Sequence, residues 1–147
     1  MMMKRMIGFA ALAYCIVGPT NLSAQTPNDS TQVAQVVHDY IVGWRNGDLE
    51  LLAQVFDPEE GVVLWASGGE GAETLNGMTF AEIIARGSRP NATYGLESEI
   101  LSLDVVDGKL AVAKVHISRS GGSYVDYLVL YKLDRGWRIV TKTFVTR

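Results

Sequence analysis

The residue best suited to do chemistry in this sequence is Asp126, a carboxylate between Val125 and Tyr127 in the run YVDYLVLYKL, residues 124 to 133. A carboxylate in a partly dry cavity can act as a general base or as a hydrogen-bond donor. The same group can also be structural, as the partner of a buried lysine or as an acceptor for backbone N–H groups. Its role depends on the elements that decide where the side chain points.

Four segments rich in apolar and β-branched residues follow one another in the second half of the chain. They span about 97 to 106, 109 to 119, 123 to 133 and 137 to 146. They are separated by the turn signals Asp107-Gly108, Gly121-Gly122 and Asp134-Arg135-Gly136. Such signals favour hairpins, so the pattern predicts an antiparallel meander of four strands.

Pairing across the first Gly-Gly turn predicts that Asp126 faces inward. If Gly121-Gly122 is a two-residue loop, Ile117 lies opposite Asp126, and both share the more apolar face of the sheet. A slip of one residue would instead bring His116 onto this face. The opposite face is predicted to be partly wet or to form a dimer contact, and it collects Val112, Lys114, His116, Tyr127, Val129 and Tyr131.

The last turn predicts a charge partner for this acid. If Asp134-Arg135-Gly136 is a three-residue loop, Phe144 lies opposite Asp126, and Lys142 is the diagonal neighbour of Asp126. Two opposite charges at these positions would lower the cost of burying each other.

The first half of the chain predicts helices that cover this sheet. Apolar residues recur at helical spacing along one face: Val33, Val36, Val37, Tyr40, Ile41 and Trp44. Asp48 caps a second helix that stops at Asp57-Pro58, and Thr79 with Glu82 forms a capping box for a short third helix. Between them lie a strand at 62 to 66 and a Gly-rich loop at 67 to 77. Helices first and antiparallel strands last predict an α+β domain with the helices on one sheet face.

Three aromatic residues are candidates for the wall of a cavity beside Asp126. Tyr40 and Trp44, one helical turn apart, either point their polar tips into the cavity or belong to the core. Trp65, beside the Gly-rich loop, either forms a lid or packs. The only two histidines lie far apart in the sequence, and the mature chain has no cysteine, so no metal site and no cofactor are expected.

The start of the 147-residue chain follows the plan of a secretory signal peptide. Lys4 and Arg5 precede an apolar run and a small-residue end, which predicts cleavage after Ala24 and a periplasmic location. The run is too short for a bilayer, which needs about 20 residues, so no membrane span is expected. Removing this segment leaves 11 basic and 16 acidic residues, a balance that disfavours nucleic acid as a partner. Residues 25–30 are interpreted as a linker and 31–147 as one domain.

Two stretches of the chain resemble the nuclear transport factor two-like superfamily, in particular its putative lumazine-binding branch. They are VVHDYIVGWRNGDLELLAQVFDP, residues 36 to 58, and YVDYLVLYKLDRGWRIVTKTF, residues 124 to 144. The resemblance implies a cone-shaped fold, with three N-terminal helices closing over a strongly bent antiparallel sheet, an internal cavity and dimerisation through the sheet. Relatives often carry His where this chain has Asp57 and Val129, and no Tyr-Asp-Asp set matches the steroid-isomerase pattern.

Together these patterns predict a secreted protein that binds a small apolar or aromatic molecule. The predicted pocket is lined by Tyr40, Trp44, Trp65 and Asp126, with Lys142 as the charge partner. One alternative is a cofactor-free lyase or isomerase, in which Asp126 moves a proton next to a carbonyl and Tyr40 stabilises the oxyanion. Another is an interaction module with a filled core that forms a homodimer through its sheet.

Overall fold

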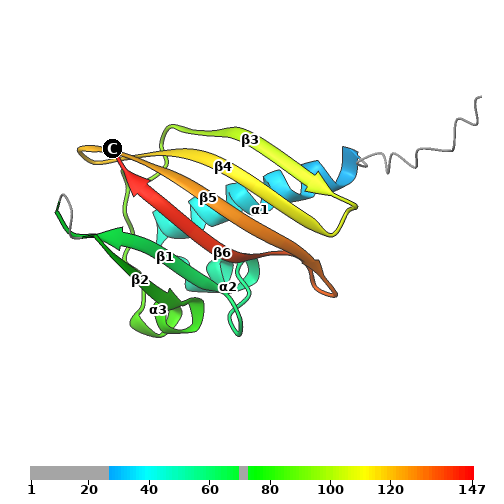
Figure 1. Cartoon of the computed structure of the whole chain (residues 1–147), viewed down its shortest axis with the longest axis horizontal. Helices are drawn as coiled ribbons and strands as arrows, with labels where there is room; N and C mark the ends of the chain where they lie inside the picture. The colour runs from blue at the N-terminus through cyan, green and yellow to red at the C-terminus, as the bar shows by residue number, and fades with distance from the viewer. Residues whose placement is uncertain (1–26, 70–72) are drawn as a thin grey trace, which may run out of the picture.

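The computed structural model describes residues 27–69 and 73–147, which form three helices and one six-stranded sheet (Figure 1). The helices are α1 (Pro27–Asn46), α2 (Leu49–Val55) and α3 (Phe80–Arg86). The strands are β1 (Val62–Ser67), β2 (Thr74–Thr79), β3 (Ser98–Val106), β4 (Leu110–Arg119), β5 (Gly122–Leu133) and β6 (Gly136–Thr146). The predicted α+β class with helices packed on one face of the sheet is confirmed. The predicted signal peptide lies outside the described residues.

Helix α1 starts earlier than the sequence predicted. It begins at Pro27, inside the segment interpreted as a linker, and proline suits the first turn of a helix because that turn leaves its N–H groups unpaired. Asp29 in this turn is buried and pairs with Lys132 Nζ at 2.6 Å, which ties the start of α1 to the end of β5. This contact with a distant strand stabilises the first turn of α1.

The sheet is mixed, which corrects the prediction of an antiparallel sheet. The strand order is β2-β1-β6-β5-β4-β3, and β1 pairs with β6 in parallel while the other neighbours are antiparallel. The prediction of three N-terminal helices is also corrected, because α3 follows β1 and β2. The first part of strand β2 overlaps the predicted Gly-rich loop. Asn76-Gly77 resembles a turn in the sequence, but Asn76 pairs with Trp65 of β1.

Two register details differ from the prediction without moving Asp126 to the other face. The β4–β5 loop is Ser120-Gly121, so Val115 and not Ile117 lies opposite Asp126. The partner of Asp126 is shifted by two residues along β4. Because side chains of a strand alternate between the two faces of the sheet, Asp126 still points to the inner face.

The β5–β6 hairpin reaches the predicted pairing by a different route. Its loop has two residues, with Leu133 opposite Gly136, and a bulge at Val140 adds the residue that the shorter loop lacks. Asp126 therefore pairs with Phe144, and Leu128 with Lys142, as predicted. A bulge also bends the strand that carries it.

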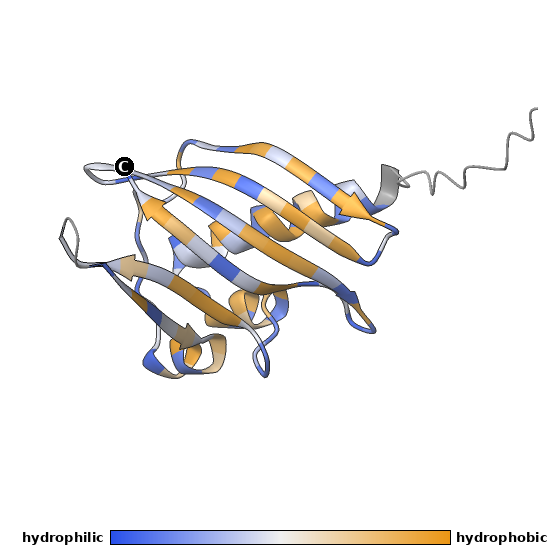
Figure 2. Cartoon of the chain, in the orientation of Figure 1, coloured by the Kyte–Doolittle hydropathy of each residue, from blue (hydrophilic) through white to orange (hydrophobic). Residues whose placement is uncertain are grey.

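The core lies between α1 and the inner face of the sheet (Figures 1 and 2). The predicted stripe of α1 is confirmed, with Val33, Val37, Tyr40 and Ile41 buried. Alternate residues of the central strands meet it, and those that are fully buried are Ala113, Val115, Ile117, Leu128, Leu130 and Ile139.

The outer face of the sheet carries apolar side chains that the described residues leave exposed. Val112, Tyr127 and Tyr131 lie on this face, with His116 half-buried beside them. Figure 2 shows orange and blue residues alternating along these strands. The homodimer through this face stays a prediction.

Candidate functional site

Asp126 on β5 is fully buried and faces Tyr40 of α1. Its Oδ2 accepts a hydrogen bond from the Tyr40 hydroxyl at 2.6 Å and lies 3.2 Å from Lys142 Nζ. Its Oδ1 is also buried and has no hydrogen-bond partner among the described residues. Both the predicted inward orientation of Asp126 and its pairing with Lys142 are therefore present.

Tyr94 completes this network and was not identified from the sequence. Its hydroxyl lies 3.0 Å from that of Tyr40. Since Tyr40 gives its single proton to Asp126, Tyr94 donates to Tyr40, which makes a chain from Tyr94 through Tyr40 to Asp126. The Arg45 side chain holds this loop by donating to the carbonyls of Tyr94 and Gly95. A lone tyrosine in the turn-rich segment SRPNATYGLES, residues 88 to 98, is the signal that could have indicated it.

Burial sets the protonation of this network. Burial, followed by the nearby Tyr94 and Asp126, raises the pKa of Tyr40 well above its usual value. Burial also raises the pKa of Tyr94, so both phenols remain protonated donors at neutral pH. For Lys142, burial lowers the pKa, and Asp126 opposes this effect. Lys142 therefore loses its proton more readily than a lysine in water.

Aromatic rings surround the Lys142 ammonium group. Nζ lies 4.4 Å from the ring centroid of Phe144, 5.5 Å from that of Tyr40 and 5.8 Å from that of Tyr124. Phe144 and Tyr124 meet edge to face, with their centroids 5.5 Å apart. A cation is attracted to ring faces at such distances, so the rings and Asp126 together hold the amine in place.

A pocket of about 250 Å³ opens beside this amine. It is formed by residues of α1, β1, β2, α3 and β6. Its lining residues come from these five elements: Trp44, Val63, Trp65, Met78, Ile83, Lys142 and Phe144. Six of these seven residues are apolar or aromatic, and Lys142 supplies the one charge. The wall is suited to an apolar molecule with a polar group at one end.

The five predicted site residues come together, in two layers. Trp44, Trp65 and Lys142 line the pocket, whereas Tyr40 and Asp126 lie behind Lys142 and are not part of the wall. The two layers touch at Lys142, which faces the pocket and contacts the buried acid. Trp44 Nε1 is buried without a hydrogen-bond partner among the described residues.

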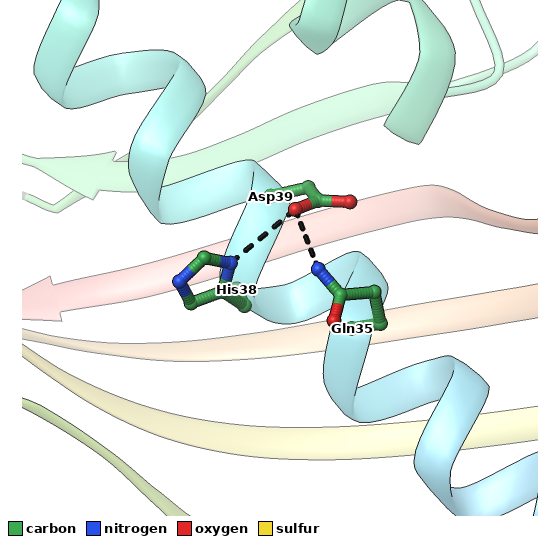
Figure 3. A network of polar contacts seen from close by, with 3 residues as sticks. All are labelled: Gln35, His38 and Asp39. Atoms are coloured by element: carbon green, nitrogen blue, oxygen red, sulfur yellow. Dashed lines mark hydrogen bonds and ion pairs between the residues drawn. The ribbon is translucent and has the colours of Figure 1, made fainter.

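A second pocket, of about 200 Å³, lies between α1 and β3. His38, Arg45 and Glu99 contribute to its wall. Figure 3 shows that His38 Nδ1 and Gln35 Nε2 both contact Asp39 Oδ1, at 3.3 and 2.8 Å. His38 is exposed and Asp39 is half-buried, and these two adjacent side chains contact each other. Polar contacts on an exposed surface contribute little stability.

The described residues contain no cluster of three or more His, Cys, Asp or Glu side chains that could hold a metal ion. Within residues 27–69 and 73–147, no helix has the length and apolar character needed to cross a membrane.

The fold defines the class of protein. An NTF2-like protein of unknown function from Shewanella baltica OS155 superimposes with a TM-score of 0.67 at 19% identity, over 82% of this chain and 94% of that one. Another, from Methylobacillus flagellatus KT, gives 0.67 at 22% identity over 83% and 94%. An NTF2-like superfamily protein from Salmonella enterica serovar Typhimurium LT2 gives 0.58 at 15% over 81% and 91%. The protein therefore has the NTF2-like fold.

The family follows from the sequence model that covers most of the chain. The model described as "Putative lumazine-binding" matches residues 28–145, so the chain belongs to this family. Comparison with curated proteins finds no match. The resemblance in residues 36 to 58 and 124 to 144 thus led to the family that the full comparison assigns.

Proposed function

We propose that this protein binds a small, flat, largely apolar aromatic molecule in the pocket beside Lys142. The observation that carries the proposal is the composition of the wall, in which Trp44, Trp65 and Phe144 surround about 250 Å³ of space next to one buried amine. Drug-sized ligands occupy pockets of about 300 to 1,000 Å³, so a smaller ligand of one or two fused rings fits best. Aromatic walls bind such rings by stacked and edge-to-face contacts.

Lys142 selects for a hydrogen-bond acceptor on that ligand. The ammonium group has three N–H donors, and among the described residues its one hydrogen-bonding contact is Asp126. A carbonyl or carboxylate oxygen in the pocket can take a remaining donor, and a charge-assisted hydrogen bond away from water is strong. The family description names lumazine, a flat heteroaromatic compound of this general class.

The position of Asp126 favours binding over the alternative lyase or isomerase. A general base must come within hydrogen-bond reach of the proton that it removes. Asp126 lies behind Lys142 and Tyr40 and outside the pocket wall, so a bound substrate meets the lysine first. The open space beside Lys142 likewise favours a binding protein over an interaction module with a filled core.

Filling the pocket from α3 tests the proposal. Ile83 lines the pocket, whereas its neighbour Ile84 does not, and both are half-buried. We expect Ile83→Trp to weaken binding of 2-naphthoate, measured by titration calorimetry, by about tenfold or more, because the indole occupies the ligand space. Ile84→Trp is the matched control and is expected to bind as the wild type does. Absence of binding by the wild type, or equal loss in both variants, contradicts the proposal.

We also propose that the protein acts outside the cytoplasm after loss of residues 1–24. The basic, apolar and small-residue segments of the leader support export. Expression of the full chain in a bacterium, followed by mass measurement of the periplasmic form, is expected to show an N-terminus at Gln25. Retention of the intact leader in the cytoplasm contradicts export.

A further inference from the structure

We propose that Lys142 captures aromatic aldehydes or ketones covalently, as an imine formed inside the pocket. This inference rests on the proposed function, because the same pocket must first admit an aromatic molecule. It extends that function from reversible binding to carbonyl chemistry at one named atom, Lys142 Nζ.

The position of the amine supports the proposal. Lys142 lines the pocket and its side chain is 11% exposed, so the amine lies beside the space that we propose a ligand occupies. Phe144 and Tyr124 pack around the amine and limit its movement. A lysine in an apolar pocket is an activated nucleophile, because the neutral amine is the reactive form and burial favours it.

The charged and titratable groups around Lys142 are suited to the steps of the reaction. β5 contributes Asp126, which contacts Nζ, and Tyr124, whose ring flanks it. α1 contributes Tyr40, and the loop before β3 contributes Tyr94 behind it. The pocket walls from β1, β2 and α3 are Val63, Trp65, Met78 and Ile83, which carry no charge. Among the described residues, Asp126 is the carboxylate that contacts the amine and is placed to accept a proton from it.

The reaction balances with a carbonyl compound alone. Asp126 Oδ2 takes a proton from the ammonium group, and Nζ then attacks the carbonyl carbon, so that a C–N bond forms and the carbonyl π bond breaks. A proton moves from nitrogen to oxygen to give the carbinolamine. A water molecule relays the proton held by Asp126 to the hydroxyl group, the C–O bond breaks and water leaves. The product is a protonated imine, whose positive charge still faces the Asp126 carboxylate, as the ammonium group did.

Reductive trapping tests the inference in the mature protein. The protein is incubated at neutral pH with 2-naphthaldehyde and cyanoborohydride, and labelled lysines are located by peptide mass spectrometry. Lys109 is exposed and serves as the internal control in the same sample. We expect Lys142 to be labelled about tenfold faster or more, because burial increases the neutral fraction of the amine. Equal or slower labelling of Lys142 overturns the inference.

Two variants and one probe separate this inference from the proposed function. Lys142→Arg keeps a positive charge beside Asp126 but cannot form an imine, so labelling at 142 is lost. Ile83→Trp is expected to slow labelling of Lys142 and leave Lys109 unchanged, because access passes through the pocket. If 2-naphthoate binds but Lys142 is not labelled, the covalent inference fails and the binding proposal stands. If 2-naphthoate does not bind either, both fail.

Discussion

Replacing Lys142 with methionine is expected to destabilise the protein by about 3–5 kcal/mol, because it leaves the Asp126 carboxylate buried without its counter-charge. Asp126 is fully buried, and the only other described group that contacts its carboxylate is the Tyr40 hydroxyl. Methionine keeps much of the lysine stem, so the apolar packing against Phe144 changes little. Urea unfolding followed by circular dichroism measures the difference in free energy of unfolding.

A second substitution isolates the charge as the cause. In the Lys142→Met background, Asp126→Asn removes the unpaired charge at nearly constant volume. We expect the double variant to recover about 1–3 kcal/mol relative to Lys142→Met alone, as coupled neighbours do. Lys109→Met, at an exposed position, is the control and should change stability by no more than about 0.5 kcal/mol. Strictly additive effects at the two sites would show that the pair is not coupled.

The second large effect is expected at Gly61, in the turn between α2 and β1. A Cβ on Gly61 would lie 2.1 Å from Phe80 Cδ2 and 2.3 Å from the Asp57 carbonyl oxygen. The turn cannot easily move away, because Gly61 N–H donates to the Asp57 carbonyl and the Gly61 carbonyl accepts from Phe80 N–H. Gly61→Ala is therefore expected to cost about 3 kcal/mol, at the upper end of overpacking substitutions.

The damage should extend to the pocket, because Phe80 supports its wall. Phe80 stacks on Phe56 with ring centroids 3.7 Å apart, and Phe56 contacts Tyr40 and the pocket residue Trp44. Thermal and urea unfolding measure the loss of stability, and 2-naphthoate titration measures the loss of binding. Gly69→Ala is the matched control, since no atom of the described residues lies within 4 Å of its added Cβ. Similar stabilities for the two variants would contradict the steric argument.

Several features of the protein could be predicted from local sequence patterns. The apolar stripe of α1 has a period close to that of the helix, and the capping box of Thr79 and Glu82 needs only neighbours in the chain. The inward orientation of Asp126 was also predictable, because side-chain direction in a strand depends only on whether a register is odd or even. The family resemblance came from two such stretches.

Other features of the fold depend on contacts between segments that are far apart in the chain, and local sequence patterns do not encode such contacts. The β5–β6 turn has two residues and not the predicted three, and a bulge at Val140 compensates for the difference. The predicted pairing of Asp126 with Phe144 was therefore correct although the predicted loop length was wrong. The parallel pairing of β1 with β6 joins segments almost 80 residues apart in the chain. Tyr94 reaches Tyr40 from a loop that the Arg45 side chain helps to hold against α1.

For the candidate site, too, the sequence indicated some features and the tertiary structure decided the others. The residue types at Tyr40, Trp44, Trp65, Asp126 and Lys142 indicate a site by themselves, because a lone acid and large aromatics on buried faces are chemically conspicuous. Their division into a pocket wall and a buried layer was decided by the tertiary structure. The physical reason is that the pocket is the space left between side chains from five elements: α1, β1, β2, α3 and β6. The sequence of one strand or helix specifies only which of its faces is buried, and not how its side chains pack against those of the other elements.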